Sequence, residues 1–486
     1  MRFAVIGAGM AGILSGVKLQ EAGHDFTIFE KADRFGGTWR ENTYPGLSCD
    51  VPSHLYSYSF ALSPDWSHRF SPGPEIHAYL ERVAREHDLE RHVRFGDEVC
   101  RCEFSDGGWQ IETASGHRDE FDVVIAATGV LHHPRFPDIE GLESFDGAMF
   151  HSSRWDHAVP LDGARVGVIG TGSTAIQITS ALVERVEKLS LFQRTAQWVM
   201  PAENPAYTDE ERAAFRADPA QLTDVHANLA NLFGIFANAV VDAGSPEIKM
   251  IEEACLANLE DNVRDPELRE RLRPDYKAAC KRLIISPDFY DAIQHPNAEL
   301  VTERIERIEP EGVRTSDGAL HELDVLVLAT GFKTHGFVAP MEIAGSGGRS
   351  LAQEWAGVPR AYFGLTVPGF PNLFVLYGPN TNGGTGSVIY TIEAGMRHVL
   401  AALATMERAD ARRIEVRREA ADEFDRTLRA ALADTVWHTG CTNWYVDENG
   451  HDPNQWPWLQ GTYRRRTARI APGAYELGAA AEYPEQ

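Results

Sequence analysis

Basic residues are scarce in this chain of 486 residues, and it has no long apolar run. Lysine and arginine total 46 against 71 aspartates and glutamates, which gives a formal net charge of −25. This charge disfavours binding to nucleic acid or to an anionic membrane surface, because both attract basic surfaces. No apolar run is long enough to span a bilayer, and no signal-peptide pattern follows Met1. We therefore expect a cytoplasmic protein without nucleic-acid or membrane partners.

Clustered cysteines are also missing. Only Cys100 and Cys102 lie close together, and no second pair or nearby histidine completes a metal site. We therefore expect no metal, and we interpret all six cysteines as ordinary core or surface thiols of a reducing compartment. The six are Cys49, Cys100, Cys102, Cys255, Cys280 and Cys441.

The chain does contain two glycine-rich turns of the kind that binds dinucleotides. The first, Gly7-Ala8-Gly9-Met10-Ala11-Gly12, follows the apolar run Phe3-Ala4-Val5-Ile6. The second, Gly170-Thr171-Gly172-Ser173-Thr174-Ala175, follows Val166-Gly167-Val168-Ile169. Each reads as a strand, a tight turn and a helix start, which directs backbone N–H groups and the positive helix end at a pyrophosphate. One such turn is weak evidence, but two in this context predict two dinucleotide sites.

The residue that ends the second strand of each unit predicts which ribose the site accepts. Glu30 stands about 20 residues past the first glycines, where an acidic side chain binds ribose hydroxyls. Both FAD and NAD satisfy that position. In the second unit the strand runs into Gln193-Arg194-Thr195 without a carboxylate. A guanidinium can clasp a 2′-phosphate that a carboxylate would repel, so we expect NADP there.

Two further strings repeat each other and predict where the backbone approaches the cofactors. Val123-Val124-Ile125-Ala126-Ala127 and Leu326-Val327-Leu328-Ala329 are apolar strands, and they close on Thr128-Gly129 and Thr330-Gly331. Glycine at a strand end often marks such a close approach. One string after each nucleotide unit is typical of a flavoprotein with a nicotinamide domain inserted into its FAD domain.

Helical spacing replaces the strand pattern after the second unit. Thr208 and Glu211 have the spacing of a capping box at the start of these helices. The length of the chain also favours two or three domains. We expect an α/β fold with two Rossmann-like dinucleotide-binding domains and a helical insertion. The expected boundaries are 1–142 and 333–486 for FAD, 143–207 and 280–332 for NADP, and 208–279 for the insertion.

The segment between the two units resembles a known fingerprint. Phe145, Gly147, His151 and Trp155-Asp156 match the pattern F-x-G-x-x-x-H-x-x-x-W-[P/D] of type I Baeyer–Villiger monooxygenases. Related flavin-containing monooxygenases usually carry Tyr or Phe at the position of Trp155. A second signature of the family is similar to Gly36-Gly37-Thr38-Trp39, followed by Tyr44-Pro45-Gly46 and Asp50. The resemblance covers the chain to about Gly386 and is more specific for class B flavoprotein monooxygenases than for the Baeyer–Villiger branch.

The resemblance implies FAD, NADPH, O2 and a small-molecule ketone substrate, oxidised to an ester or lactone through a C4a-peroxyflavin. It implies a catalytic pair of Arg282 and Asp50, with Lys281 beside Arg194 on the 2′-phosphate. A fixed guanidinium would stabilise the negative charge of that reaction. The cofactor contacts expected from the motifs and the resemblance are Gly7, Gly9, Met10, Ala11, Gly12, Glu30, Gly37, Thr38, Trp39, Asp50, Tyr56, Val99, Thr128, Gly129, Thr171, Gly172, Ser173, Thr174, Ala175, Gln177, Arg194, Thr195 and Lys281.

Other features keep more than one interpretation. His151 and Trp155 lie on the link between nucleotide domains in the family, which favours packing or a hinge over chemistry. Trp437 and the segment 440–445 resemble the mobile loop that closes over NADP, and core packing fits them equally well. An N- or S-oxygenase that takes sulfides or amines stays open as the alternative function. A disulfide reductase is disfavoured by the absence of a C-x-x-C pair, and a non-catalytic flavin module by the intact charged residues. The oligomeric state is not predicted.

Overall fold

The computed structural model describes residues 1–105 and 107–478. A five-stranded parallel sheet of order β19-β7-β1-β2-β3 contains the first glycine turn. Its apolar strands are short and bounded by glycine turns, as buried parallel strands are. The strands are β1 (Arg2–Ile6), β2 (Asp25–Glu30), β3 (Val93–Phe95), β7 (Val123–Ala126) and β19 (Leu373–Val375).

A second parallel sheet of order β13-β10-β9-β17-β8 contains the second glycine turn. Each glycine-turn strand pairs with a Thr-Gly strand, β1 with β7 and β9 with β17, so the two units repeat one design. The strands are β8 (Ala148–His151), β9 (Arg165–Ile169), β10 (Lys188–Phe192), β13 (Ala298–Val301) and β17 (Val325–Leu328).

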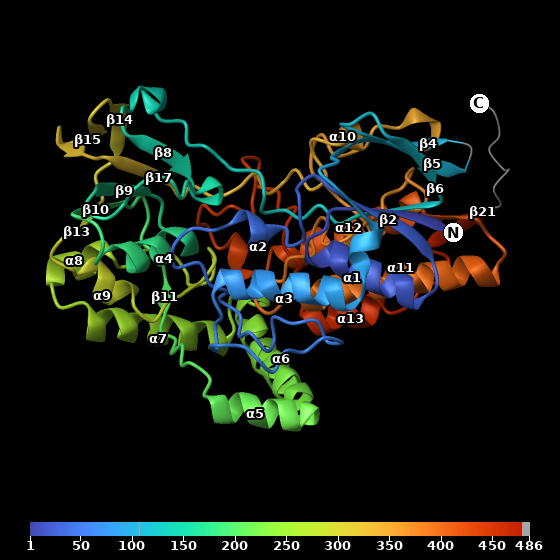
Figure 1. Ribbon diagram of the computed structural model, residues 1–486, viewed down its shortest axis with the longest axis horizontal. Helices are drawn as coiled ribbons and strands as arrows, with labels where there is room; N and C mark the ends of the chain where they lie inside the picture. Colours follow the sequence, from blue (N-terminus) through green and yellow to red (C-terminus); the bar gives the residue numbers. More distant parts are fainter. Residues whose placement is uncertain (106, 479–486) are drawn as a thin grey trace.

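The two sheets lie at opposite ends of the long axis of the molecule (Figure 1). The last strand of the first sheet, β19, comes after the second sheet is complete, so the second unit interrupts the first in the sequence. This confirms the expected fold class. The domain boundaries themselves stay a prediction, and residues 479–486 of the expected FAD domain lie outside the described residues.

Each sheet is covered on both faces. Along β1, Phe3 and Val5 point into one core, whereas Ala4 and Ile6 point into another that a smaller sheet completes. That smaller sheet contains β4 (Val99–Ser105), β5 (Gly108–Thr113), β6 (Arg118–Phe121) and β18 (Glu342–Ala344), and the second sheet has a comparable cover of β14 (Ile305–Glu309), β15 (Gly312–Thr315) and β16 (Leu320–Glu322). Helices fill the other faces, and they include α1 (Met10–Glu21), α3 (Gly73–Glu86), α4 (Ser173–Leu182), α9 (Phe289–Ile293) and α11 (Val388–Arg408).

The expected helical insertion is present and extends away from both sheets (Figure 1). Thr208 caps its first helix: the Thr208 side chain accepts a hydrogen bond from the backbone N–H of Glu211, and the Glu211 carboxylate accepts one from the N–H of Thr208. The predicted capping box is therefore confirmed. The helices are α5 (Asp209–Ala217), α6 (Pro219–Val241), α7 (Pro246–Asn262) and α8 (Pro266–Arg271).

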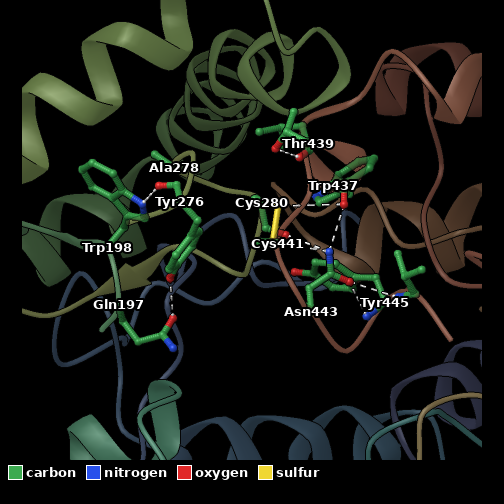
Figure 2. Close-up of a disulfide and its surroundings, with 12 residues drawn as sticks. Gln197, Trp198, Tyr276, Ala278, Cys280, Trp437, Thr439, Cys441, Asn443 and Tyr445 are labelled. Atoms are coloured by element: carbon green, nitrogen blue, oxygen red, sulfur yellow. Dashed lines mark hydrogen bonds between the residues drawn. A yellow bond between two sulfur atoms is a disulfide. The ribbon is translucent and has the colours of Figure 1, made fainter. Parts of the chain in front are cut away.

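The C-terminal part returns to the first sheet. It contains β20 (Arg413–Val416), α12 (Arg418–Leu432), the short helix η5 (Val436–His438), α13 (Gln460–Thr467) and β21 (Tyr475–Gly478). The loop between η5 and α13 reaches the segment that carries Lys281 and Arg282 (Figure 2). Within the described part of the chain, no helix has the length and apolar character needed to cross a bilayer.

Candidate active site

One cavity of about 1500 Å³ is lined by residues of both nucleotide units. Pockets for a single drug-sized ligand measure roughly 300–1,000 Å³, so this space is larger than one small ligand needs. Most of the residues expected from the sequence line it. They are Gly7, Gly9, Met10, Ala11, Glu30, Gly37, Thr38, Trp39, Asp50, Tyr56, Val99, Thr128, Gly129, Thr171, Gly172, Ser173, Thr174, Gln177, Arg194, Thr195, Lys281 and Arg282.

Gly12 and Ala175 do not line the cavity, and their role as cofactor contacts stays a prediction. A side-chain carbon added to Gly12 would lie 1.8 Å from the carbonyl oxygen of Gly7, so this glycine lets α1 pack directly on the turn. Ala175 is fully buried in the first turn of α4. Both residues lie in the first turn of a helix, on a side that faces the protein interior and not the cavity. They therefore support the glycine turns through packing.

Both glycine turns fit a bound phosphate. The N-cap residues are Gly9 in α1 and Gly172 in α4, so neither helix start is capped by a side chain. The N–H groups of a first helical turn lack partners inside the helix, so a helix start without a side-chain cap suits an anion. A side-chain carbon on Gly172 would meet nothing within 4 Å, and one on Gly9 would come within 3.4 Å of Gly37. The backbone is thus open to a ligand at both turns.

Glu30 lies at the cavity wall with its carboxylate held by three donors. It accepts hydrogen bonds from the N–H groups of Ala8 (2.7 Å) and Ala32 (2.9 Å), and Arg40 donates to it at 3.0 Å. Glu30 is 5% exposed, and the arginine pairs with it at the end of β2. The carboxylate therefore fixes the glycine turn and offers its remaining oxygen lone pairs to the cavity. Arg40 was not expected from the sequence.

Two cations face the second turn. The pKa of Lys281 is lowered, because burial disfavours its charge and Arg194 repels it. The Lys281 ammonium lies 4.6 Å from the ring centre of Tyr276, whose hydroxyl donates to Gln197 at 3.0 Å. Among the described residues, neither Lys281 nor Arg194 forms an ion pair. Asp275 attracts the Lys281 ammonium but forms no ion pair with it, so both cations remain available to a phosphate.

Asp50 and Arg282 form a bidentate ion pair in the cavity, although 232 residues separate them. The guanidinium donates from Nε at 2.9 Å and from Nη2 at 2.7 and 2.6 Å. The side chain of Asp50 is 14% exposed and that of Arg282 is 38% exposed, so the arginine presents a face to the cavity. The negative charge of Asp50 raises the pKa of Arg282 further above its usual value. The pair expected from the sequence is therefore assembled.

A short strand just after Arg282 fixes the position of the arginine segment. β11 (Val199–Met200) and β12 (Ile284–Ile285) pair in parallel, and the N–H of Ile284 donates to the carbonyl of Trp198 at 3.1 Å. Burial raises the pKa of Tyr377 to about 12, although the charge of Arg282 opposes this shift. The pairing of β12 with β11 therefore anchors the segment that carries Arg282.

Gln177 has a structural partner that the sequence did not reveal. Its Oε1 accepts a hydrogen bond from the Tyr44 hydroxyl at 2.9 Å, and its Nε2 donates to the carbonyl of Ser48 at 3.1 Å. Gln177 lies on α4 of the second unit, whereas Tyr44 and Ser48 precede Asp50 in the first. The side chain therefore connects the two units near the catalytic pair.

The structure distinguishes the interpretations that the sequence left open for the His151–Trp155 fingerprint and for the aromatic residues near the C-terminus. His151 is 2% exposed at the end of β8, where its ring contacts the carbonyl of Gly331 and the N–H of Ser153. Neither His151 nor Trp155 lines the cavity, which supports packing. Trp437 is 1% exposed and belongs to the core, whereas Trp444 lines the cavity.

Two cysteines form a disulfide, which corrects the prediction that all six are ordinary thiols. Cys280 and Cys441 are bonded, while Cys49, Cys100, Cys102 and Cys255 are free. The partners are 161 residues apart, and sequence spacing does not reveal such a connection. Cysteine usage therefore no longer supports a reducing compartment, and the cytoplasmic location stays a prediction. In the described ranges, no group of three or more His, Cys, Asp or Glu side chains could hold a metal ion.

A cavity shared by two dinucleotide turns, with an Arg–Asp pair between them, defines a two-dinucleotide oxidoreductase. Comparisons with known proteins agree. The family model described as "Flavin-binding monooxygenase-like" matches residues 1–207. A Baeyer–Villiger monooxygenase of Streptomyces coelicolor is 39% identical over 98% of this chain and 92% of its own length. An uncharacterised monooxygenase of Mycobacterium tuberculosis is 44% identical over 98% of this chain and 95% of its own length.

Solved structures give the same result. Cyclohexanone monooxygenase from Rhodococcus sp. Phi1, bound to NADP+, matches with a TM-score of 0.88 at 31% identity and covers 98% of this chain and 99% of its own. A steroid monooxygenase bound to NADP matches with a TM-score of 0.87 at 30% identity, over 98% of this chain and 100% of its own. The chain belongs to the Baeyer–Villiger monooxygenases. It is an FAD- and NADPH-dependent flavoprotein monooxygenase.

Proposed function

We propose that the substrate is a small-molecule ketone and that Arg282 stabilises the negative charge that develops on it while one oxygen atom of O2 is inserted beside the carbonyl. The single observation that carries this proposal is the bidentate Arg282–Asp50 pair in the cavity between the two glycine turns. The product is an ester, or a lactone when the ketone is cyclic.

The residues of the two glycine turns would hold the two cofactors. Gly7, Gly9 and Glu30 would hold FAD, because the start of α1 suits its pyrophosphate. Gly172 and Ser173 at the start of α4 would hold the NADPH pyrophosphate, and Arg194 and Lys281 would hold its 2′-phosphate. Reduced FAD, when bound, supplies the electrons that activate O2 for transfer of one oxygen atom.

Arg282 acts on the substrate by charge. When the carbonyl carbon becomes tetrahedral, its oxygen gains negative charge, and a fixed guanidinium in a low-dielectric cavity stabilises that charge without reorganising. Asp50 holds one edge of the guanidinium, through its Nε and Nη2 N–H groups, and thereby sets its direction. Asp50 also offsets the positive charge of Arg282 whenever the substrate carries no negative charge.

A sulfide or amine substrate would use the same cavity differently. Oxygen transfer to sulfur or nitrogen leaves no anionic carbonyl oxygen, so it needs the guanidinium less. The relatives named for Baeyer–Villiger chemistry support the ketone as the main substrate class.

The test is incubation of the FAD-loaded enzyme with NADPH, O2 and matched panels of ketones and sulfides, with products identified by mass. We expect esters or lactones from at least one class of ketone, heavier than the substrate by one oxygen atom. Sulfoxides without any ester would overturn the ketone assignment. Consumption of NADPH without an oxygenated product from either panel would overturn both substrate classes.

A further inference from the structure

The Cys280–Cys441 disulfide joins two segments that both line the cavity (Figure 2). Cys280 is fully buried and directly precedes Lys281 and Arg282. Cys441 lies in the segment 439–446, which we call the Trp444 loop. Thr442, Asn443 and Trp444 of this loop line the cavity. The bond thus connects the Trp444 loop covalently to the segment that carries both cations.

Tyr445 anchors the C-terminal side of the Trp444 loop, because it is fully buried and its carbonyl accepts a hydrogen bond from Asn454 at 2.9 Å. Toward residue 280, the noncovalent attachment of the loop runs through Asn443. Asn443 Nδ2 donates to the carbonyls of Cys280 (3.1 Å) and Trp437 (3.0 Å), as Figure 2 shows in part. Asn443 Oδ1 accepts from the N–H groups of Tyr445 and Val446, each at 3.0 Å. Elsewhere, the Thr334 hydroxyl donates to the carbonyl of Trp444 at 3.3 Å. Among the described residues, the one hydrogen bond from the Trp444 loop to Cys280 is that of Asn443, so the disulfide is the stronger of the two links between them.

We propose that Cys280 and Cys441 are a peroxide-responsive thiol pair, which in its oxidised form fixes the Trp444 loop against the Lys281–Arg282 segment and so tightens the hold of the cavity on NADP. The proposal rests on the proposed function for its oxidant, because a reduced flavin that meets O2 without substrate releases hydrogen peroxide. The pair lies beside the cavity in which that peroxide forms.

The exposure of the two sulfurs sets the order of the chemistry. Cys441 is partly exposed and Cys280 is fully buried, so peroxide reaches Cys441 first. The Cys441 thiolate attacks the peroxide O–O bond, which gives a sulfenic acid and releases hydroxide. The Cys280 thiolate then attacks the sulfenic sulfur and displaces a second hydroxide. In total, two thiols and one hydrogen peroxide give one disulfide and two waters, and a dithiol reductant reverses the change.

The experiment uses the FAD-loaded enzyme in two forms, one treated with hydrogen peroxide and one with a dithiol. Peptide mapping without reduction identifies the Cys280–Cys441 link, and titration with NADP+ gives the dissociation constant of each form. We expect the link only in the oxidised form, and a dissociation constant roughly tenfold higher in the reduced form. Limited proteolysis should cut the Trp444 loop faster in the reduced form.

Two variants separate this effect from general thiol chemistry. Cys441→Ser should bind NADP+ like the reduced wild type whatever the treatment, whereas Cys100→Ser, which removes an exposed free thiol, should behave like wild type. If Cys441→Ser does not fold, the two forms of the wild type still give the comparison. Absence of the link at every peroxide concentration, or equal dissociation constants for the two forms, would overturn the proposal. These readouts need no ketone, so a failure of the proposed substrate class would leave them unaffected.

Discussion

Replacing Arg282 by alanine tests the proposed chemistry most specifically. The guanidinium is held by Asp50 at 2.6–2.9 Å, and the side chain lines the cavity and is 38% exposed, so it is oriented before the substrate arrives. Removing one such preorganised group typically costs about 2.7–4 kcal/mol, or roughly 100- to 1,000-fold in kcat. We therefore expect Arg282→Ala to retain FAD and to consume NADPH, but to form ester at least a hundredfold more slowly. The oxygen that is not transferred should appear as hydrogen peroxide.

The assay measures ester, hydrogen peroxide and NADPH consumption in the same samples. Arg165→Ala is the matched control, because Arg165 also donates twice to one carboxylate, Asp324, but lies outside the cavity. This partly exposed ion pair is worth little, so the control should stay within about twofold of wild type. Arg282→Lys should give an intermediate loss, since an ammonium cannot form the bidentate pair. Full ester formation by Arg282→Ala would refute the role of the guanidinium, and the same loss in the control would show a nonspecific effect.

Three further predictions follow from other contacts. Arg194→Ala should raise the KM for NADPH roughly ten- to a hundredfold, because a charge-assisted contact contributes about 1.5–3 kcal/mol. The KM for NADH should stay unchanged, and equal KM values for both cofactors in the wild type would contradict this prediction. Gly9→Val should abolish the flavin absorbance of the purified protein, because the branched side chain would fill the space at the start of α1 that the FAD pyrophosphate needs. A yellow variant would show that the first turn does not hold FAD. His398 is 1% exposed, and burial lowers its pKa to about 4, so its neutral form is favoured in the fold and the unfolded chain takes up a proton first as pH falls below about 6.5. The free energy of unfolding should therefore fall by up to about 3 kcal/mol between pH 6.5 and 4 from this residue, and urea titrations of His398→Gln should show a correspondingly smaller pH dependence, whereas an unchanged dependence would contradict the assignment.

Local patterns made much of the fold predictable. Gly7 and Gly9 stand between an apolar strand and a helix, and such a turn requires only neighbouring residues to form. The same is true of the second turn at Gly172 and of the capping box at Thr208. Glu30 was predicted because it ends a strand at a fixed distance from the glycines. Its bonds to Ala8, Ala32 and Arg40 were not predicted, because they depend on how the turn folds back over the strand end.

The contacts between distant segments could not be predicted from spacing. Arg282 and Asp50 were paired by resemblance to a family, since 232 residues separate them. Nothing in the sequence pairs Cys280 with Cys441, because each is an isolated cysteine and 161 residues separate them. Tyr276, which lies beneath the Lys281 ammonium, is likewise visible only once the second unit is folded.

Incubation under oxygen-18 gas tests the central claim, oxygen insertion next to a ketone carbonyl, most directly. The FAD-loaded enzyme is supplied with NADPH, labelled O2 and a ketone that it accepts, and the ester is fragmented in a mass spectrometer to locate the label. The account predicts one labelled atom per ester, at the bridging oxygen, with the carbonyl oxygen of the substrate unlabelled. An ester without the label, or the label at the carbonyl oxygen alone, would contradict it.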